Sequence, residues 1–110
     1  MNDLNALNAL KALAQENRLA AFRLLVQAGS EGMPVGDLRE ALGIPAATLS
    51  AHLNILRSAG LVIDQREGRV IRIRADYAQM NGLQTFLTEN CCQGTACEAT
   101  NTPLETCKEC

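Results

Sequence analysis

The stretch PAATLSAHLNILRSAGLVIDQREGRVIRIR, residues 45–74, changes its hydrophobic period halfway along. In its first half Leu49, Leu53 and Leu56 recur at spacings of four and three. This spacing keeps the three side chains on one face of an α-helix, so it predicts a helix over residues 45–58. The helix is expected to bury its leucines and to present the opposite face to solvent or to a partner.

The second half of the stretch, after Gly60, predicts a β-hairpin. The segments LVIDQR and RVIRIR are rich in β-branched residues and are separated by Glu67-Gly68. Glycine supplies the positive φ that a tight hairpin turn needs. In the second segment Arg72 and Arg74 alternate with isoleucines, so one face of that strand is basic and the other apolar.

Four further helices are predicted around this stretch, over residues 3–14, 16–28, 34–42 and 76–90. The helix over 34–42 stops at Gly43, a short turn before the helix over 45–58, which is the pattern of a helix-turn-helix. The complete order predicts a mainly α fold with a small β-hairpin. This is a winged helix-turn-helix, in which the hairpin is the wing.

The first two helices are predicted from their apolar spacing. In the first, leucines at every third position predict a single apolar stripe: Leu4, Leu7, Leu10 and Leu13. The second is expected to be largely buried through Leu19, Phe22, Leu25 and Val26. The last helix follows Asp76, a residue type suited to the N-cap.

Small and polar side chains lie opposite the leucines of the helix over 45–58. On a helical wheel Ala47, Ala51 and Asn54 point outward, Thr48 and Ser50 flank them, and His52 lies nearer the buried side. Such a helix can enter the roughly 12 Å major groove of DNA, while wing guanidinium groups meet phosphates or the minor groove. The predicted DNA-binding residues are Ala47, Thr48, Ser50, Ala51, His52, Asn54, Arg66, Arg69 and Arg72.

The length and composition are those of one domain, with 110 residues, of which 47% are hydrophobic. Residues 45–75 carry a net charge of +3 and residues 76–110 a net charge of −4, so only the middle of the chain suits a polyanion. No apolar run approaches the roughly 18 residues of a membrane span, and the first residues do not resemble a secretory signal. We therefore expect a cytoplasmic protein with no membrane partner.

All five cysteines lie in the last twenty residues, at Cys91, Cys92, Cys97, Cys107 and Cys110. An odd number of cysteines in a cytoplasmic chain argues against a disulfide framework, because the glutathione pool keeps thiols reduced. Metal, metalloid or redox chemistry is the better expectation for this segment.

The run TLSAHLNILRSAGLVIDQREGRVIRIR, residues 48–74, closely resembles the recognition helix and wing of the ArsR/SmtB metal-sensing repressors. The run ALAQENRLAAFRLLV, residues 12–26, is similar to the second helix of that family. The resemblance implies a homodimer formed through its first and last helices, an operator with dyad symmetry, and release of DNA when an inducer binds. Residues 1–90 are then a DNA-binding and dimerisation domain, and residues 91–110 a Cys-rich metalloid-binding tail.

The chain departs from the family pattern where the founding arsenic repressors place a C-V-C motif, because that position reads GIPAATL, residues 43–49. Interfacial zinc sites built from histidines are also disfavoured, since His52 is the only histidine. The segment TENCCQGTAC, residues 88–97, resembles a subgroup of arsenic-responsive repressors with a Cys-Cys pair and a third Cys after the last helix. The resemblance implies that Cys91, Cys92 and Cys97 bind trivalent arsenic or antimony as the inducer.

Thiolate chemistry agrees with this assignment and leaves alternatives. Trivalent arsenic and antimony take three sulfurs in a pyramid, whereas structural zinc takes four ligands. Cys107 and Cys110 form a C-x-x-C pair that could hold a second centre or complete a four-Cys site for zinc, cadmium or lead. An oxidant sensor is a further alternative. A thiol enzyme is disfavoured, because these cysteines follow a helix C-terminus among acidic residues, a setting that does not activate a nucleophile.

Overall fold

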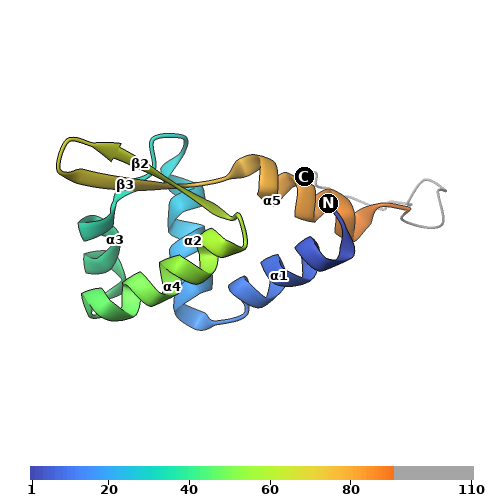
Figure 1. The fold of residues 1–110 in the computed structure, drawn as a ribbon, viewed down its shortest axis with the longest axis horizontal. Coiled ribbons are helices and arrows are strands. Elements are labelled where there is room, and N and C mark those ends of the chain that lie inside the picture. The colour runs from blue at the N-terminus through green and yellow to red at the C-terminus, as the bar shows by residue number, and fades with distance from the viewer. Residues whose placement is uncertain (91–110) are drawn as a thin grey trace.

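The computed structural model describes residues 1–90, which form a winged helix-turn-helix, as predicted (Figure 1). None of the helices in this part of the chain is long and apolar enough to cross a membrane. In chain order the elements are α1 (Asp3–Leu13), α2 (Glu16–Ala28), β1 (Met33–Pro34), α3 (Val35–Leu42), α4 (Ala46–Ser58), β2 (Val62–Glu67), β3 (Val70–Ala75) and α5 (Tyr77–Thr88).

The three strands form an antiparallel sheet in the order β1-β3-β2, and β2 and β3 extend from the body as the wing (Figure 1). Glu67 pairs with Val70, so the hairpin turn consists of Gly68 and Arg69, one residue later than predicted. Gly68 has the positive φ of 63° that this turn requires. The short strand β1, which pairs with the middle of β3, was not predicted from the sequence.

The core lies between the sheet and the helices α2, α3 and α4. Leucines supply most of it because their flexible branched side chains fill the space between elements that cross at different angles. The largest fully buried side chains are Leu25 of α2, Leu38 of α3, Leu49, Leu53 and Leu56 of α4, Leu61 before the wing, and Ile73 of β3. The burial of the α4 leucines confirms the face predicted from their spacing.

The prediction for α1 was wrong about which stripe faces the core. Its buried residues are Ala6, Ala9 and Ala12, whereas Leu4, Leu7 and Leu10 are 65%, 48% and 40% exposed. A spacing of three falls 60° short of a full helical turn at each step, so the leucine stripe winds around α1 and away from the core. The small alanines let α1 approach its neighbours closely, and the leucines are left on the outside.

Two smaller differences concern α2 and α5. Leu19 of α2 was expected in the core but is 45% exposed, whereas Phe22 and Leu25 are buried as predicted. Helix α5 begins as predicted, with the side chain of Asp76 accepting a hydrogen bond from the backbone N–H of Gln79 at 3.2 Å. It ends at Thr88, two residues before the predicted end.

Gly32 tests the seam between β1 and β3. It has a φ of +66°, and a Cβ placed on it would collide with the carbonyl oxygen of Ile73. We expect Gly32→Ala to lower the free energy of unfolding by about 2 kcal/mol or more, because it adds both backbone strain and a clash with backbone. Gly36→Ala is the matched control, since that helical position has open space, and it should stabilise by about 0.5 kcal/mol. Urea unfolding of both variants measures this, and equal stabilities would contradict the described seam.

Candidate nucleic-acid interface

The turn between α3 and α4 is short because Gly43 ends α3 in the left-handed conformation. Its φ is 66° and its N–H donates to the carbonyl oxygens of Arg39 at 2.9 Å and Glu40 at 3.3 Å. Only Ile44 and Pro45 then separate it from α4. Gly43 therefore satisfies carbonyl groups at the end of α3 and fixes the direction in which α4 starts.

The outward face of α4 consists of small and polar side chains, as the sequence predicts. Ala47, Ser50, Ala51 and Asn54 are exposed, and Thr48 is half-buried. The side-chain oxygen of Asn54 accepts a hydrogen bond from Arg57 at 2.8 Å. Since no bulky side chain stands on this face, the backbone of α4 can approach the edges of base pairs closely.

His52 is half-buried, on the inner side of α4 as predicted, and it faces an arginine of α2. The guanidinium NH1 of Arg18 lies 3.4 Å from Nδ1 of His52, and Nε of Arg18 donates to the carbonyl oxygen of Ala12 at 2.6 Å. A guanidinium group can only donate, so Nδ1 of His52 is the acceptor in this contact. Arg18 thus connects the end of α1 and the start of α2 to α4.

The sequence analysis did not single out Arg18 as a functional residue. A signal was present, because Arg18 lies in a helix that was expected to be largely buried, where a charged group needs a partner. His52 supplies that partner from a position 34 residues along the chain. No spacing rule within one helix connects residues so far apart in the sequence.

The wing arginines divide into exposed and engaged side chains. Arg66 and Arg69 are exposed near the tip of the wing. Arg72 is half-buried, and it donates from Nε to the carbonyl oxygen of Glu31 at 3.1 Å and from NH2 to that of Gly32 at 3.4 Å. Its Nε also lies 3.9 Å from a carboxylate oxygen of Glu67. Arg72 therefore fixes the wing to the loop before β1, while Arg66 and Arg69 are available to a partner.

Arg57, at the end of α4, also has a structural role. Its Nε lies 2.9 Å from Oδ2 of Asp64 on β2, but it is not aligned for a hydrogen bond, so the contact is an ion pair. Because both side chains are about a third exposed or more, solvent screens much of this attraction. The pair nonetheless relates the end of α4 to the wing.

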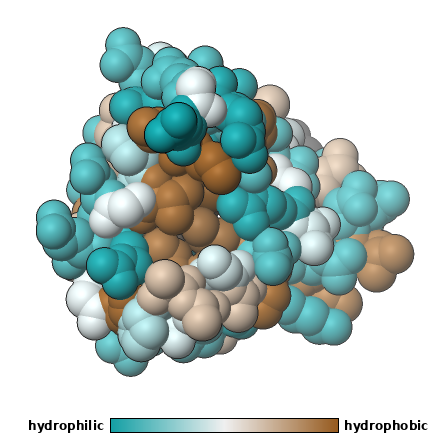
Figure 2. Space-filling model, turned by 60° about the vertical axis from the view of Figure 1, so that its left-hand side comes forward, coloured by the Kyte–Doolittle hydropathy of each residue, from teal (hydrophilic) through white to brown (hydrophobic). Residues whose placement is uncertain are grey.

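Figure 2 views the molecule from the side on which α3 and the wing lie in Figure 1. Hydrophilic residues cover most of this face and surround a hydrophobic area near its centre. On the wing, the exposed large hydrophobic residues are Val70 and Ile71, at 47% and 36% exposure. The face that carries the wing is thus mainly polar, as a surface that meets the DNA backbone should be.

The predicted thiolate ligands lie outside the described residues. This applies to Cys91, Cys92, Cys97, Cys107 and Cys110 alike. Within residues 1–90 no group of three or more His, Cys, Asp or Glu side chains is placed to hold a metal ion.

Comparisons with known proteins agree with this geometry. A family model described as a helix-turn-helix domain matches residues 13–65, from the end of α1 to the wing. The chain is 41% identical over 64 residues to the HTH-type transcriptional regulator NmtR of Mycobacterium tuberculosis, a match that covers 58% of this chain and 51% of NmtR. It is 35% identical over 74 residues to the arsenical resistance operon repressor of Escherichia coli, covering 67% of this chain and 62% of the repressor. The chain thus spans about half to two thirds of the length of these relatives.

A solved structure is similar over more of the chain. It is the homodimeric winged helix-turn-helix DNA-binding domain of a possible ArsR-family transcriptional regulator from Mycobacterium bovis. The two are 31% identical with a TM-score of 0.61, and the match covers 78% of this chain and 80% of the other.

The fold and the exposed face of α4 define a winged helix-turn-helix protein of the DNA-binding class. The chain belongs to the ArsR/SmtB family of helix-turn-helix transcriptional regulators. The relatives are regulators, so the expectation of a regulator instead of an enzyme is confirmed.

The two kinds of wing arginine can be separated by substitution. Arg69→Gln should weaken DNA binding without changing the free energy of unfolding, because its side chain is exposed. Arg72→Gln should also destabilise the protein by about 1 kcal/mol, because it leaves the carbonyl groups of Glu31 and Gly32 without their donor. Urea unfolding and fluorescence anisotropy on duplex DNA measure the two effects. Equal stability of both variants would show that Arg72 does not anchor the wing.

Proposed function

We propose that the protein is an arsenic-responsive transcriptional repressor that binds operator DNA as a homodimer and leaves it when trivalent arsenic or antimony binds C-terminal thiolates. The observation that carries the DNA-binding part is the outward face of α4, small and polar over four turns, beside the exposed arginines of the wing. The predicted base-reading positions are Ala47, Thr48, Ser50, Ala51 and Asn54, with His52 holding the helix through Arg18.

The exposed leucines of α1 support a dimer through the first and last helices. Leu4, Leu7 and Leu10 are exposed on α1, and α5 lies beside α1 at the end of the molecule away from the wing, where Leu87 is 58% exposed (Figure 1). A groove of about 420 Å³ between α2 and α5, lined mainly by apolar side chains, lies next to them. An exposed apolar surface of this kind favours association with a second copy. The similar domain from M. bovis is homodimeric.

The sensing site is proposed on the chemistry of the sequence that follows α5. Cys91 and Cys92 come three and four residues after the last residue of α5, and Cys97 follows after a connection of four residues that contains Gly94. Three thiolates within seven residues match the three-sulfur preference of trivalent arsenic, and thiolates select soft, thiophilic centres. The arsenical resistance operon repressor of E. coli is among the similar proteins, and so is NmtR, so a sensor of zinc, cadmium, lead or oxidant is the second candidate.

Helix α5 provides a route by which ligand binding could act on α4. The side-chain amide of Gln79 donates to the carbonyl oxygen of Ala59 at 3.0 Å, just after the end of α4. The backbone N–H of Asp76 donates to the carbonyl oxygen of Leu61 at 2.8 Å. A shift of α5 therefore changes contacts at the end of α4, and a coupling free energy of ~1 to 3 kcal/mol would be typical of such regulation.

The dimer is tested by Leu7→Glu. A carboxylate in the middle of the exposed leucines should dissociate the dimer, because burying an unpaired charge at an interface is strongly unfavourable. Sedimentation equilibrium should report a monomer, with weaker DNA binding. Val70→Glu is the matched control, since it places the same charge on an exposed apolar position of the wing, and it should leave the dimer intact. A dimeric Leu7→Glu protein would place the interface elsewhere.

The sensing site is tested by fluorescence anisotropy of the reduced protein on duplex DNA from upstream of its own gene. Stoichiometric arsenite should release the wild type, and zinc should not. Cys91→Ser and Cys92→Ser should bind DNA normally and fail to respond, because two sulfurs hold the metalloid more weakly than three. The Cys107→Ser, Cys110→Ser double variant is the control and should still respond. Normal release of the first two variants would overturn the site, and release by zinc alone would favour the four-Cys alternative.

A further inference from the structure

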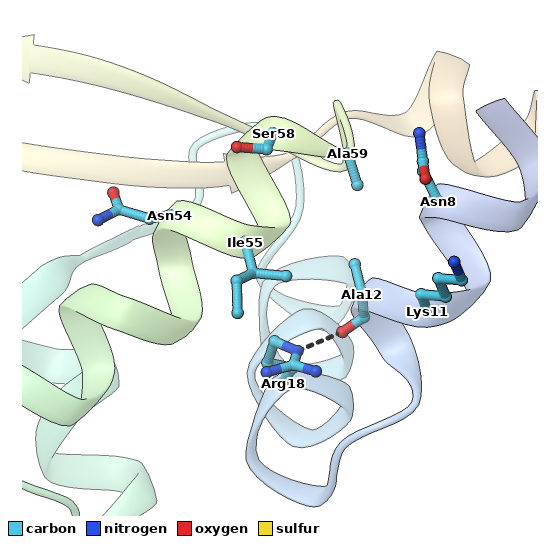
Figure 3. Close-up of a pocket in the computed structure, with 8 residues that line it drawn as sticks. All are labelled: Asn8, Lys11, Ala12, Arg18, Asn54, Ile55, Ser58 and Ala59. Atoms are coloured by element: carbon cyan, nitrogen blue, oxygen red, sulfur yellow. Dashed lines mark hydrogen bonds between the residues drawn. The ribbon is translucent and has the colours of Figure 1, made fainter. Parts of the chain in front are cut away.

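A cleft of about 500 Å³ lies between α1 and the C-terminal half of α4 (Figure 3). Asn8 and Lys11 of α1 line one wall, and Ile55 and Ser58 of α4 line the other. Arg18 of α2 lies between the two helices and reaches the carbonyl oxygen of Ala12 (Figure 3). No part of the DNA-reading face described above assigns a role to this cleft.

The charge of the cleft suits an anion. Lys11 and Arg18 carry two positive charges, and none of the residues that line the cleft is acidic. The C-terminal ends of α1 and α4 contribute roughly half a negative charge each, which the two full positive charges exceed. Arg18 is also held in place by Ala12 and His52, so its guanidinium group is already oriented before an anion arrives.

The position of the cleft indicates which anion it meets. Asn54 and Ser58, at the edge of the cleft, continue the outward stripe of α4 that begins with Ala47 and Ala51, at spacings of four, three and four. With 13 residues α4 is about 20 Å long, whereas the major groove is about 12 Å wide. If the first turns of α4 lie in the groove, its last turn lies over the phosphates at the groove edge.

We propose that this cleft holds a backbone phosphate of the operator, bound by Lys11 at its mouth and by Arg18 at its base. The inference rests on the proposed DNA-binding function and adds to it a phosphate contact from α1 and α2, outside the helix-turn-helix and wing. Each protomer of the dimer contributes one such contact, and so the contact fixes the angle at which α4 enters the groove.

Lys11→Gln tests the proposal, because Lys11 is exposed and its loss should not affect folding. Losing two phosphate contacts per dimer should reduce the slope of log affinity against log salt by about 1.8, with roughly tenfold weaker binding at physiological salt. Fluorescence anisotropy on operator DNA over a series of KCl concentrations measures the slope. Lys11→Arg keeps the charge and should retain the wild-type slope. Arg23→Gln, which removes a charge from the groove between α2 and α5, should also retain it.

An unchanged slope for Lys11→Gln, or an equal loss for Arg23→Gln, would overturn the phosphate contact while leaving the proposed function intact. A wild-type protein that binds no operator would overturn both. Inorganic phosphate, titrated into the DNA-free protein and followed by the backbone amide resonances of Lys11 and Ser58, distinguishes the other source of this chemistry. Saturation by free phosphate together with an unchanged slope for Lys11→Gln would assign the cleft to a free anion instead.

Discussion

The burial of three leucines on one face of α4 is the constraint on which the other features of this protein depend. Leu49, Leu53 and Leu56 are at most 1% exposed, and burying each contributes about 1.5 to 3 kcal/mol. Rotating α4 about its axis would bring these leucines into water, so the opposite face is held outward. The same packing directs His52 toward Arg18 and brings the end of α4 to the base of the wing. The surface offered to DNA is therefore fixed by what the helix buries.

The sequence was sufficient for features that depend on neighbours along the chain. The α4 leucines, the Gly43 turn, the Asp76 cap and the hairpin each follow from spacing or residue type, and each was predicted. What failed depends on packing between elements. Either the leucine or the alanine stripe of α1 could have faced the core, and only the close approach of the neighbouring helices selects the alanines. The strand β1 is two residues long and exists because β3 offers it a partner.

The candidate site was predictable to the same extent. The residues of the outward face follow from the position of the leucines, so they could be read from one helix. The roles of Arg18 and Arg72 could not, because their partners lie 34 and about 40 residues away in the sequence. A periodic pattern shows that an arginine is on a basic face and does not show whether its guanidinium group is already engaged. Three-dimensional contacts therefore divide the arginines into those that build the wing and those that remain available.

The strand order β1-β3-β2 leaves β2 at the edge of the sheet along its six residues. An edge strand of this length offers unpaired backbone groups to another chain, and charged side chains are a common protection against such pairing. Asp64, Arg66 and Glu67 are exposed along β2 and supply that protection. The charges near the wing tip therefore also keep copies of the protein from joining edge to edge. Wing variants made neutral to weaken DNA binding will lose part of this solubility, and aggregation will then lower the concentration of active protein.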